Sequence, residues 1–144
     1  MHQDYKSPLL KWLRDRQQQQ LTRESALSQI NAAEQLIGKI ENDGNYPAGE
    51  VLPHIAGEPL PQAGNRRIPG SDLVHDLLLF VEDLSDSADL SADTVGEQVF
   101  TVEELAKQFN VSTKTISRWR ALGLVSRRLV FDGRKRVGFL RSSV

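Results

Sequence analysis

The residues of this chain whose types can do chemistry are the basic side chains gathered toward its C-terminal end. Residues 100–144 contain ten Lys or Arg and three Asp or Glu, a net charge of +7. Residues 1–99 contain eight and sixteen, a net charge of −8, so the overall charge of −1 conceals two halves of opposite sign. A polyanion is attracted to one half and repelled by the other. Phosphate binding is therefore the chemistry that the composition indicates.

Catalytic and metal-binding patterns are missing from the sequence. There is no cysteine, and the three histidines, His2, His54 and His75, are scattered without metal-ligand spacing. His75 and Asp76 are consecutive, and consecutive residues of a helix do not face each other. Neither glycine-rich phosphate-loop pattern occurs. We therefore expect no enzyme, no metal and no cofactor.

The spacing of residues 99–144 predicts two short helices joined by a tight turn. Thr101 caps the first helix, 102–109, and residues 110–111 make the turn. Ser112 caps the second helix, which Gly123 ends in a left-handed conformation. Seven apolar residues are spaced to form a small shared core: Val102, Leu105, Ala106, Val111, Ile116, Leu122 and Leu124.

This packing leaves one side of the second helix turned outward, where it can enter the DNA major groove. Lys114 and Arg118 are four residues apart and therefore share a face. Trp119 either joins the small core or packs against the DNA backbone. The outward residues are Thr113, Lys114, Ser117, Arg118 and Ala121.

A β-hairpin follows, because Asp132-Gly133 stands between two β-prone runs, 127–131 and 134–140. Phe131 and Phe139 are expected to anchor it on the helices. Its basic residues predict a wing that grips phosphates or enters the minor groove. The predicted DNA-binding residues of both elements are Thr113, Lys114, Ser117, Arg118, Arg120, Arg127, Arg128, Arg134, Lys135 and Arg136.

The N-terminal half is predicted to be helical. Ser7-Pro8 starts a helix, and apolar residues at steps of three and four after Thr22 indicate another that ends near Glu41. These segments form either a helical hairpin or one long helix with a fault near Leu21-Thr22.

Residues 44–70 hold five of the six prolines and five of the ten glycines, which predicts an irregular loop, mobile or covered by a partner. Ser71 is expected to cap a third helix, 72–84, that is apolar on most sides and therefore central. Small, polar and acidic residues over 85–98 predict a linker.

The expected fold is mainly α. A helical domain over 1–84, for partner binding or dimerisation, precedes a winged helix-turn-helix over 99–144 with a β-hairpin wing. We find no internal repeat with a period of 20–50 residues. The first residues contain no uninterrupted apolar core, and no run approaches a membrane span of about 20 residues, so a cytoplasmic protein without membrane contact is expected.

The segment FTVEELAKQFNVSTKTISRWRALGL resembles the MerR-like and excisionase-like winged-helix DNA-binding domains. With the segments NAAEQLIGKI, NYP, HDLLLFVEDLSDSADL and VFDGRKRVGFL, the chain is similar to the N-terminal part of certain bacterial sigma-70-like factors. The similarity covers most of the chain, strongly over 71–144 and loosely over 8–47, while 52–69 departs from the pattern. Relatives begin another helix where this sequence has Ser142-Ser143-Val144, so it is either a fragment of a longer factor or a stand-alone relative.

The resemblance implies a sequence-specific module that binds double-stranded DNA in transcription regulation or initiation. RNA polymerase and a second copy of the chain are further candidate partners. Two alternatives share the fold: an excisionase-like architectural DNA binder, and a winged helix that docks on a protein such as RNA polymerase. In a related hypothesis, the acidic segment 82–97 folds back over the basic face and weakens DNA binding.

Overall fold

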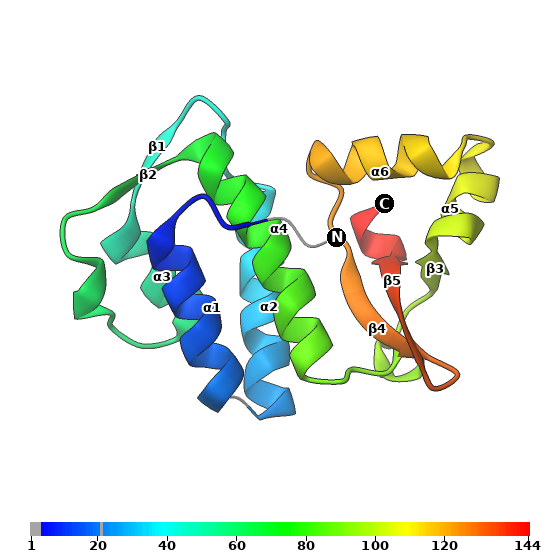
Figure 1. The fold of residues 1–144 in the computed structure, drawn as a ribbon, viewed down its shortest axis with the longest axis horizontal. Coiled ribbons are helices and arrows are strands. Elements are labelled where there is room, and N and C mark those ends of the chain that lie inside the picture. The colour runs from blue at the N-terminus through cyan, green and yellow to red at the C-terminus, as the bar shows by residue number, and fades with distance from the viewer. Residues whose placement is uncertain (1–3, 21) are drawn as a thin grey trace.

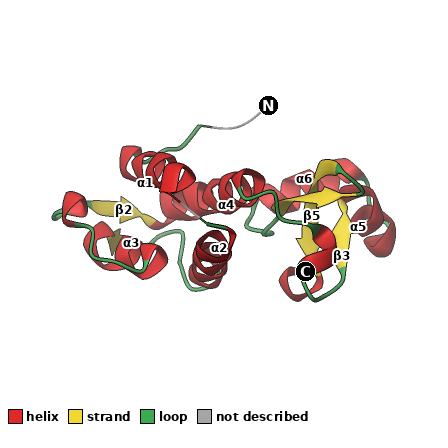
Figure 2. Ribbon diagram, turned by 90° about the horizontal axis from the view of Figure 1, so that it is seen from below, coloured by secondary structure: helices red, strands yellow, loops and turns green. Residues whose placement is uncertain are grey.

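The computed structural model describes residues 4–20 and 22–144 and shows a mainly helical chain with a small antiparallel sheet. Two units lie side by side, with the N-terminal helices in one and the three-stranded sheet in the other (Figures 1 and 2). The mainly helical class predicted from the sequence is confirmed. His2 and Leu21, which the sequence predictions mention, lie outside the described residues.

The N-terminal unit is built around three helices, α1 (Pro8–Gln20), α2 (Arg23–Ile37) and α4 (Gly70–Ser87). The first two are separate helices, and the side chain of Thr22 caps α2 by accepting from the backbone N–H of Ser25 at 3.2 Å. Helix α2 ends at Ile37, short of the predicted Glu41. As predicted, α4 is central, packing against both α1 and α2, and its buried apolar residues are Leu73, Leu77, Leu79, Phe80, Val81 and Leu84.

Residues 44–70 are not an irregular loop, and that prediction was wrong. They form β1 (Asn45–Pro47), α3 (Ala48–Ala56), a short 3-10 helix η1 (Pro61–Ala63) and β2 (Arg67–Pro69), with β1 antiparallel to β2. Six side chains of the segment are buried in the main core: Ala48, Leu52, Ile55, Leu60, Ala63 and Ile68.

The prolines and glycines of this segment mostly stand where elements begin and end. Pro47 and Pro69 precede helices, and Pro61 opens η1, positions where a missing N–H costs nothing. Gly57 ends α3 at a φ of 75°, a conformation that glycine adopts without steric cost. Gly49 and Pro53 are exceptions, since both lie inside α3. Counting prolines and glycines hid the helical spacing of the buried residues between them.

Helix α4 starts at Gly70, with Pro69 rather than Ser71 at the cap position and no side-chain cap, so the predicted Ser71 cap was wrong. Gly70 is required there, because a Cβ on it would lie 1.9 Å from the backbone oxygen of Glu41. Further along α4, the buried carboxylate of Asp76 accepts two backbone hydrogen bonds from the residues just before α1. The donors are the N–H groups of Lys6 at 2.8 Å and Ser7 at 2.7 Å.

The C-terminal unit consists of β3 (Val99–Thr101), α5 (Val102–Phe109), α6 (Thr113–Ala121), β4 (Arg127–Phe131), β5 (Arg134–Leu140) and the 3-10 turn η3 (Arg141–Ser143). The strands are antiparallel in the order β3-β5-β4. The hairpin of β4 and β5 was predicted, whereas β3 was not.

The predicted linker 85–98 is only partly a linker. Its first three residues are the last turn of α4, which runs to Ser87, and Ala92–Thr94 form a 3-10 turn, η2. Ser85 is fully buried. The division between the two units therefore lies after α4, and the connection between them is short.

The same local arrangement occurs three times, in that a three-residue strand runs directly into a helix: β1 into α3, β2 into α4 and β3 into α5. In each unit the first strand is antiparallel to the last one, with Tyr46 opposite Ile68 and Phe100 opposite Phe139. Between these strands the N-terminal unit has α3 and η1, whereas the C-terminal unit has α5, α6 and β4.

Candidate nucleic-acid interface

Side-chain caps fix the start of both short helices of the C-terminal unit. Thr101 Oγ1 accepts from the N–H of Glu104 at 3.1 Å, and the Glu104 carboxylate accepts from the N–H of Thr101 at 2.9 Å. Ser112 Oγ accepts from the N–H of Thr115 at 3.2 Å. Between them, Asn110 adopts a left-handed φ of 54° and turns the chain from α5 to α6. Both predicted caps are confirmed.

A small core holds these helices on the sheet. Leu105, Ala106, Ile116 and Phe139 are buried, and Trp119 packs partly buried against them with its ring edge-on to Phe109 at 5.5 Å between centroids. Trp119 thus belongs to the core side. The partly buried members that complete the core are Phe100, Val102, Val111, Leu124 and Val137.

Leu122 was predicted in this core, and that was wrong, since it is 84% exposed. It follows the last turn of α6, where Gly123 at a φ of 120° redirects the chain. Leu124 takes the inward position instead, and its backbone N–H donates to the carbonyl of Trp119 at 2.9 Å.

The outward side of α6 carries the predicted polar and basic residues. Thr113, Lys114, Ser117 and Arg118 are all exposed, while Ile116 on the opposite side is fully buried. Ser117 Oγ donates to the carbonyl of Thr113 at 3.3 Å. Within residues 4–20 and 22–144, no carboxylate forms an ion pair with Lys114 or Arg118, so two cations on one helix face are open to a ligand.

The hairpin has the predicted two-residue turn. Phe131 pairs with Arg134, and both turn residues, Asp132 and Gly133, have positive φ, 49° and 81°. Arg134 and Arg136 are exposed on β5. Figure 1 shows this turn and α6 at opposite ends of the C-terminal unit.

The other basic residues of the hairpin and of α6 face the N-terminal unit and the acidic residues that end and follow α4, the segment that the sequence analysis considered as folding back over the basic face. Arg127 is 4% exposed, and its guanidinium donates to both carboxylate oxygens of Glu34 at 2.8 and 2.7 Å and to the amide oxygen of Asn31 at 3.0 Å. Arg127 was predicted to contact DNA, but in this arrangement its guanidinium is covered by α2.

Arg120 is held in the same way by the end of α4. Its guanidinium is paired with Glu82 and donates to Ser126 Oγ at 3.2 Å. Ser126 Oγ in turn donates to Glu82 Oε1 at 2.8 Å. This triad fixes the link between α6 and β4 against α4, so Arg120 also differs from its predicted role at a free surface.

Lys135 and Arg128 complete the contact, nearer the hairpin turn. Lys135 Nζ lies 3.0 Å from Asp86 Oδ1 and 2.8 Å from Asp89 Oδ1, and Arg128 Nε lies 3.4 Å from Asp86 Oδ1. Hydrogen bonding and charge from Lys135 lower the pKa of Asp89, and hydrogen bonds to Asp89 and Asp86 raise the pKa of Lys135. These side chains are 39–58% exposed.

The outer edge of β4 is covered by the residues that end and follow α4. The backbone N–H of Arg128 donates to Ser85 Oγ at 2.8 Å, and that of Val130 donates to the carbonyl of Leu90 at 2.8 Å. An uncovered edge strand would leave these groups unpaired.

The ten predicted DNA-binding residues divide into two sets. The set facing outward is Thr113, Lys114, Ser117, Arg118, Arg134 and Arg136; the set facing the N-terminal unit is Arg120, Arg127, Arg128 and Lys135.

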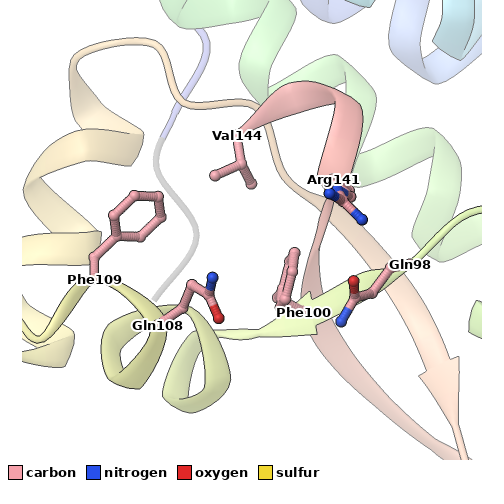
Figure 3. A pocket seen from close by; sticks show the side chains of 6 residues that line it. All are labelled: Gln98, Phe100, Gln108, Phe109, Arg141 and Val144. Atoms are coloured by element: carbon pink, nitrogen blue, oxygen red, sulfur yellow. The ribbon is translucent and has the colours of Figure 1, made fainter.

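A hollow of about 340 Å³ opens between β3, α5 and η3 (Figure 3). Aromatic rings, two amides and the Arg141 guanidinium meet around it, and the described residues that line it include no carboxylate or imidazole side chain. Such a lining can hold a small polar or aromatic group. The lining residues are Gln98, Phe100, Gln108, Phe109, Arg141 and Val144.

Comparisons of the chain with protein-family models, with curated proteins and with solved structures found no match. None of the helices in residues 4–20 and 22–144 combines the length and the apolar character needed to cross a membrane.

The sequence prediction did not name the partners of Arg127 on α2, the amide of Asn31 and the carboxylate of Glu34. The other acidic partners, Glu82, Asp86 and Asp89, lie in the segment 82–97, which the sequence analysis considered as folding back over the basic face. The opposite charges of the two halves were the only signal that could have found the partners on α2. That signal predicts attraction but does not say which residues meet.

Proposed function

We propose that the C-terminal unit is a winged helix-turn-helix that binds double-stranded DNA, with α6 in the major groove. The observation that carries this proposal is the two-sided character of α6. Ile116 is buried on one side, and Thr113, Lys114, Ser117 and Arg118 are exposed on the other. Arg and Lys donate to guanine edges, and Ser and Thr donate to bases or phosphates. The resemblance of its sequence to DNA-binding domains of sigma-70-like factors favours a role in transcription.

The division of the basic residues narrows the proposed contact surface. Lys114 and Arg118 supply the helix contacts, and Arg134 and Arg136 supply phosphate contacts from the wing. Arg120 and Arg127 act as structural residues that fix α6 and the hairpin on the N-terminal unit. Carboxylates of the N-terminal unit, Glu82 and Glu34, bind these two arginines. In this proposal the N-terminal unit therefore lies beside the exposed face of α6 and does not cover it.

The salt dependence of DNA binding tests this proposal quantitatively. The logarithm of the binding constant falls with the logarithm of salt concentration by about 0.9 for each phosphate contact. If Lys114, Arg118, Arg134 and Arg136 are the cations that contact phosphates, the slope is at most about −3.6. The measurement is fluorescence anisotropy of the full chain with labelled duplex DNA of mixed sequence. Absence of salt-dependent binding would refute the proposal, and a slope near −7 would refute the division of the basic residues.

A second candidate function is docking on an acidic protein surface, with RNA polymerase as the candidate that the resemblance suggests. The hairpin already binds carboxylates within its own chain, at Glu34, Asp86 and Asp89, which favours this alternative. Variants of Lys114 and Arg118 separate the two functions. If these variants lose duplex DNA binding that the wild type has, the DNA-binding function is supported. If the wild type itself does not bind duplex DNA, only docking on a protein remains.

A further inference from the structure

Lys135 is surrounded by oxygen atoms of the segment that ends α4. Its ammonium donates to the backbone carbonyl of Asp86 at 2.9 Å and lies 3.0 and 2.8 Å from one carboxylate oxygen of Asp86 and one of Asp89. Arg128 Nε lies 3.4 Å from the same carboxylate oxygen of Asp86. Two cations and two anions therefore meet at one place on the hairpin.

This cluster differs from the other contacts between the units because it is open to solvent. The side chains of Asp86, Asp89, Arg128 and Lys135 are 42%, 58%, 45% and 39% exposed, whereas that of Arg127 is 4% exposed. Exposed ion pairs contribute little to stability and are screened by salt. Breaking the Arg127 pair instead leaves a buried charge without its partner, which is strongly unfavourable.

The two carboxylates hold the cations mainly by charge. Asp86 Oδ1 is itself shielded from solvent, although its side chain as a whole is 42% exposed, and both cations lie near it. Asp89 adopts a left-handed φ of 51°, a conformation that aspartate adopts more readily than most other non-glycine residues.

We propose that Arg128 and Lys135 form a phosphodiester-binding site on the hairpin, and that the carboxylates of Asp86 and Asp89 occupy this site until DNA replaces them. The inference rests on the proposed DNA-binding function and deepens it, because it assigns the acidic end of α4 the role of an internal competitor for the phosphate backbone. Asp86 and Asp89 lie near each other and can occupy positions that two anionic oxygens of DNA would take.

The competition has a thermodynamic signature. A phosphate that binds a free lysine releases condensed counterions, and this release produces the salt dependence of binding. A phosphate that displaces Asp86 and Asp89 leaves two carboxylates that attract cations from solution in return. The exchange therefore adds little to the salt slope in the wild type. Neutral amides at the two positions remove this compensation.

The experiment compares the full-length wild type with the double variant Asp86→Asn and Asp89→Asn in duplex DNA binding at several salt concentrations. The control is the double variant Asp43→Asn and Glu50→Gln, which changes the net charge equally at two exposed carboxylates of the N-terminal unit. We expect the first variant to bind more tightly at low salt and to steepen the slope by about 1.8, for two added phosphate contacts. Over a fourfold rise in salt it then loses about tenfold more affinity than the wild type.

The outcomes distinguish this inference from the function on which it rests. A steeper slope in the Asp86 and Asp89 variant but not in the control supports the inference. Equal slopes in the wild type and both variants, or a similar steepening in the control, overturn it and leave DNA binding in place. Absence of salt-dependent binding by the wild type and both variants refutes the proposed function itself. Thermal unfolding of all three proteins establishes that they are folded at the temperature of the titrations.

Discussion

The guanidinium of Arg127 lies flat against the carboxylate of Glu34, with Nε donating to Oε2 at 2.8 Å and Nη2 donating to Oε1 at 2.7 Å. The two residues are 93 positions apart, and the guanidinium is 4% exposed. This bidentate pair joins α2 of the acidic unit to β4 of the basic unit. It is one of several ion pairs between the two halves of opposite charge.

Arg127→Ala is expected to destabilise the chain strongly, because it leaves the half-buried carboxylate of Glu34 without its cation. Breaking a buried pair from one side costs about 3–5 kcal/mol. Urea unfolding followed by circular dichroism measures the change. Arg136→Ala, on the exposed part of the same hairpin, is the matched control and should stay within about 0.5 kcal/mol of the wild type. A similarly small effect of Arg127→Ala would contradict the assignment of a buried pair.

Ser85→Ala tests the contact between α4 and the edge of β4. Ser85 Oγ accepts from the N–H of Arg128 at 2.8 Å and lies 2.7 Å from the carbonyl of Val81, to which it donates. Removing it leaves a backbone N–H unsatisfied at about 1–3 kcal/mol. Ser87→Ala changes an exposed serine two residues away and is the control. Hydrogen exchange of the Arg128 amide should accelerate in Ser85→Ala only, and equal exchange rates in both variants would argue against this bond.

The parts of the fold that the sequence predicted are those that depend on neighbouring residues. Thr101 with Glu104, and Ser112 with Thr115, make capping bonds over three positions, and Asp132-Gly133 forms a turn from its own two residues. Such features depend on little beyond local backbone geometry. The outward set of α6 followed from the same local logic, since helical spacing alone places Lys114 beside Arg118.

The parts that the sequence did not predict depend on distant partners. No local pattern shows that Arg127 faces Glu34 or that Ser85 covers the edge of β4. From the sequence alone, every arginine of the hairpin is therefore an equally good candidate for a phosphate contact. The prediction of an irregular loop over 44–70 was wrong for another reason. The number of prolines and glycines indicates a loop, but their positions allow a helix, and the spacing of Ala48, Leu52 and Ile55 is helical.

Tyr5 is expected to make stability depend on alkaline pH. Burial raises the pKa of Tyr5 above its ordinary value of 10.0, and the negative charge of neighbouring Asp83 raises it further. The Tyr5 hydroxyl donates a hydrogen bond to Asp83 Oδ2 at 2.7 Å. Below about pH 10 the phenol is protonated in the folded and unfolded chains alike. Above it, the unfolded chain loses the proton while the folded chain keeps it. Stability should then fall by up to about 1.4 kcal/mol for each further pH unit.

Tyr5→Phe checks this expectation, because it has no phenol to ionise. Urea unfolding of both proteins from about pH 9 to about pH 11 gives the comparison, and lysines that titrate in this range are common to both. The variant should be less stable than the wild type at neutral pH, where it lacks the bond to Asp83, and should lose less stability on alkalinisation. Parallel alkaline losses in the two proteins would show that Tyr5 does not carry the effect.

Arg118→Ala is expected to relax sequence preference more than it weakens binding to DNA in general. If Arg118 donates to a base edge in the major groove, its loss costs about 1–3 kcal/mol at the preferred sequence and little elsewhere. Arg134→Ala, on the wing, should weaken binding to all duplexes alike and reduce the salt slope by about 0.9. The measurement is selection of bound sequences from random duplex DNA by the wild type, followed by anisotropy titrations of each variant with the selected and a scrambled duplex. If both variants lose the same free energy on both duplexes, α6 does not read sequence, and its exposed cations serve only to hold phosphates.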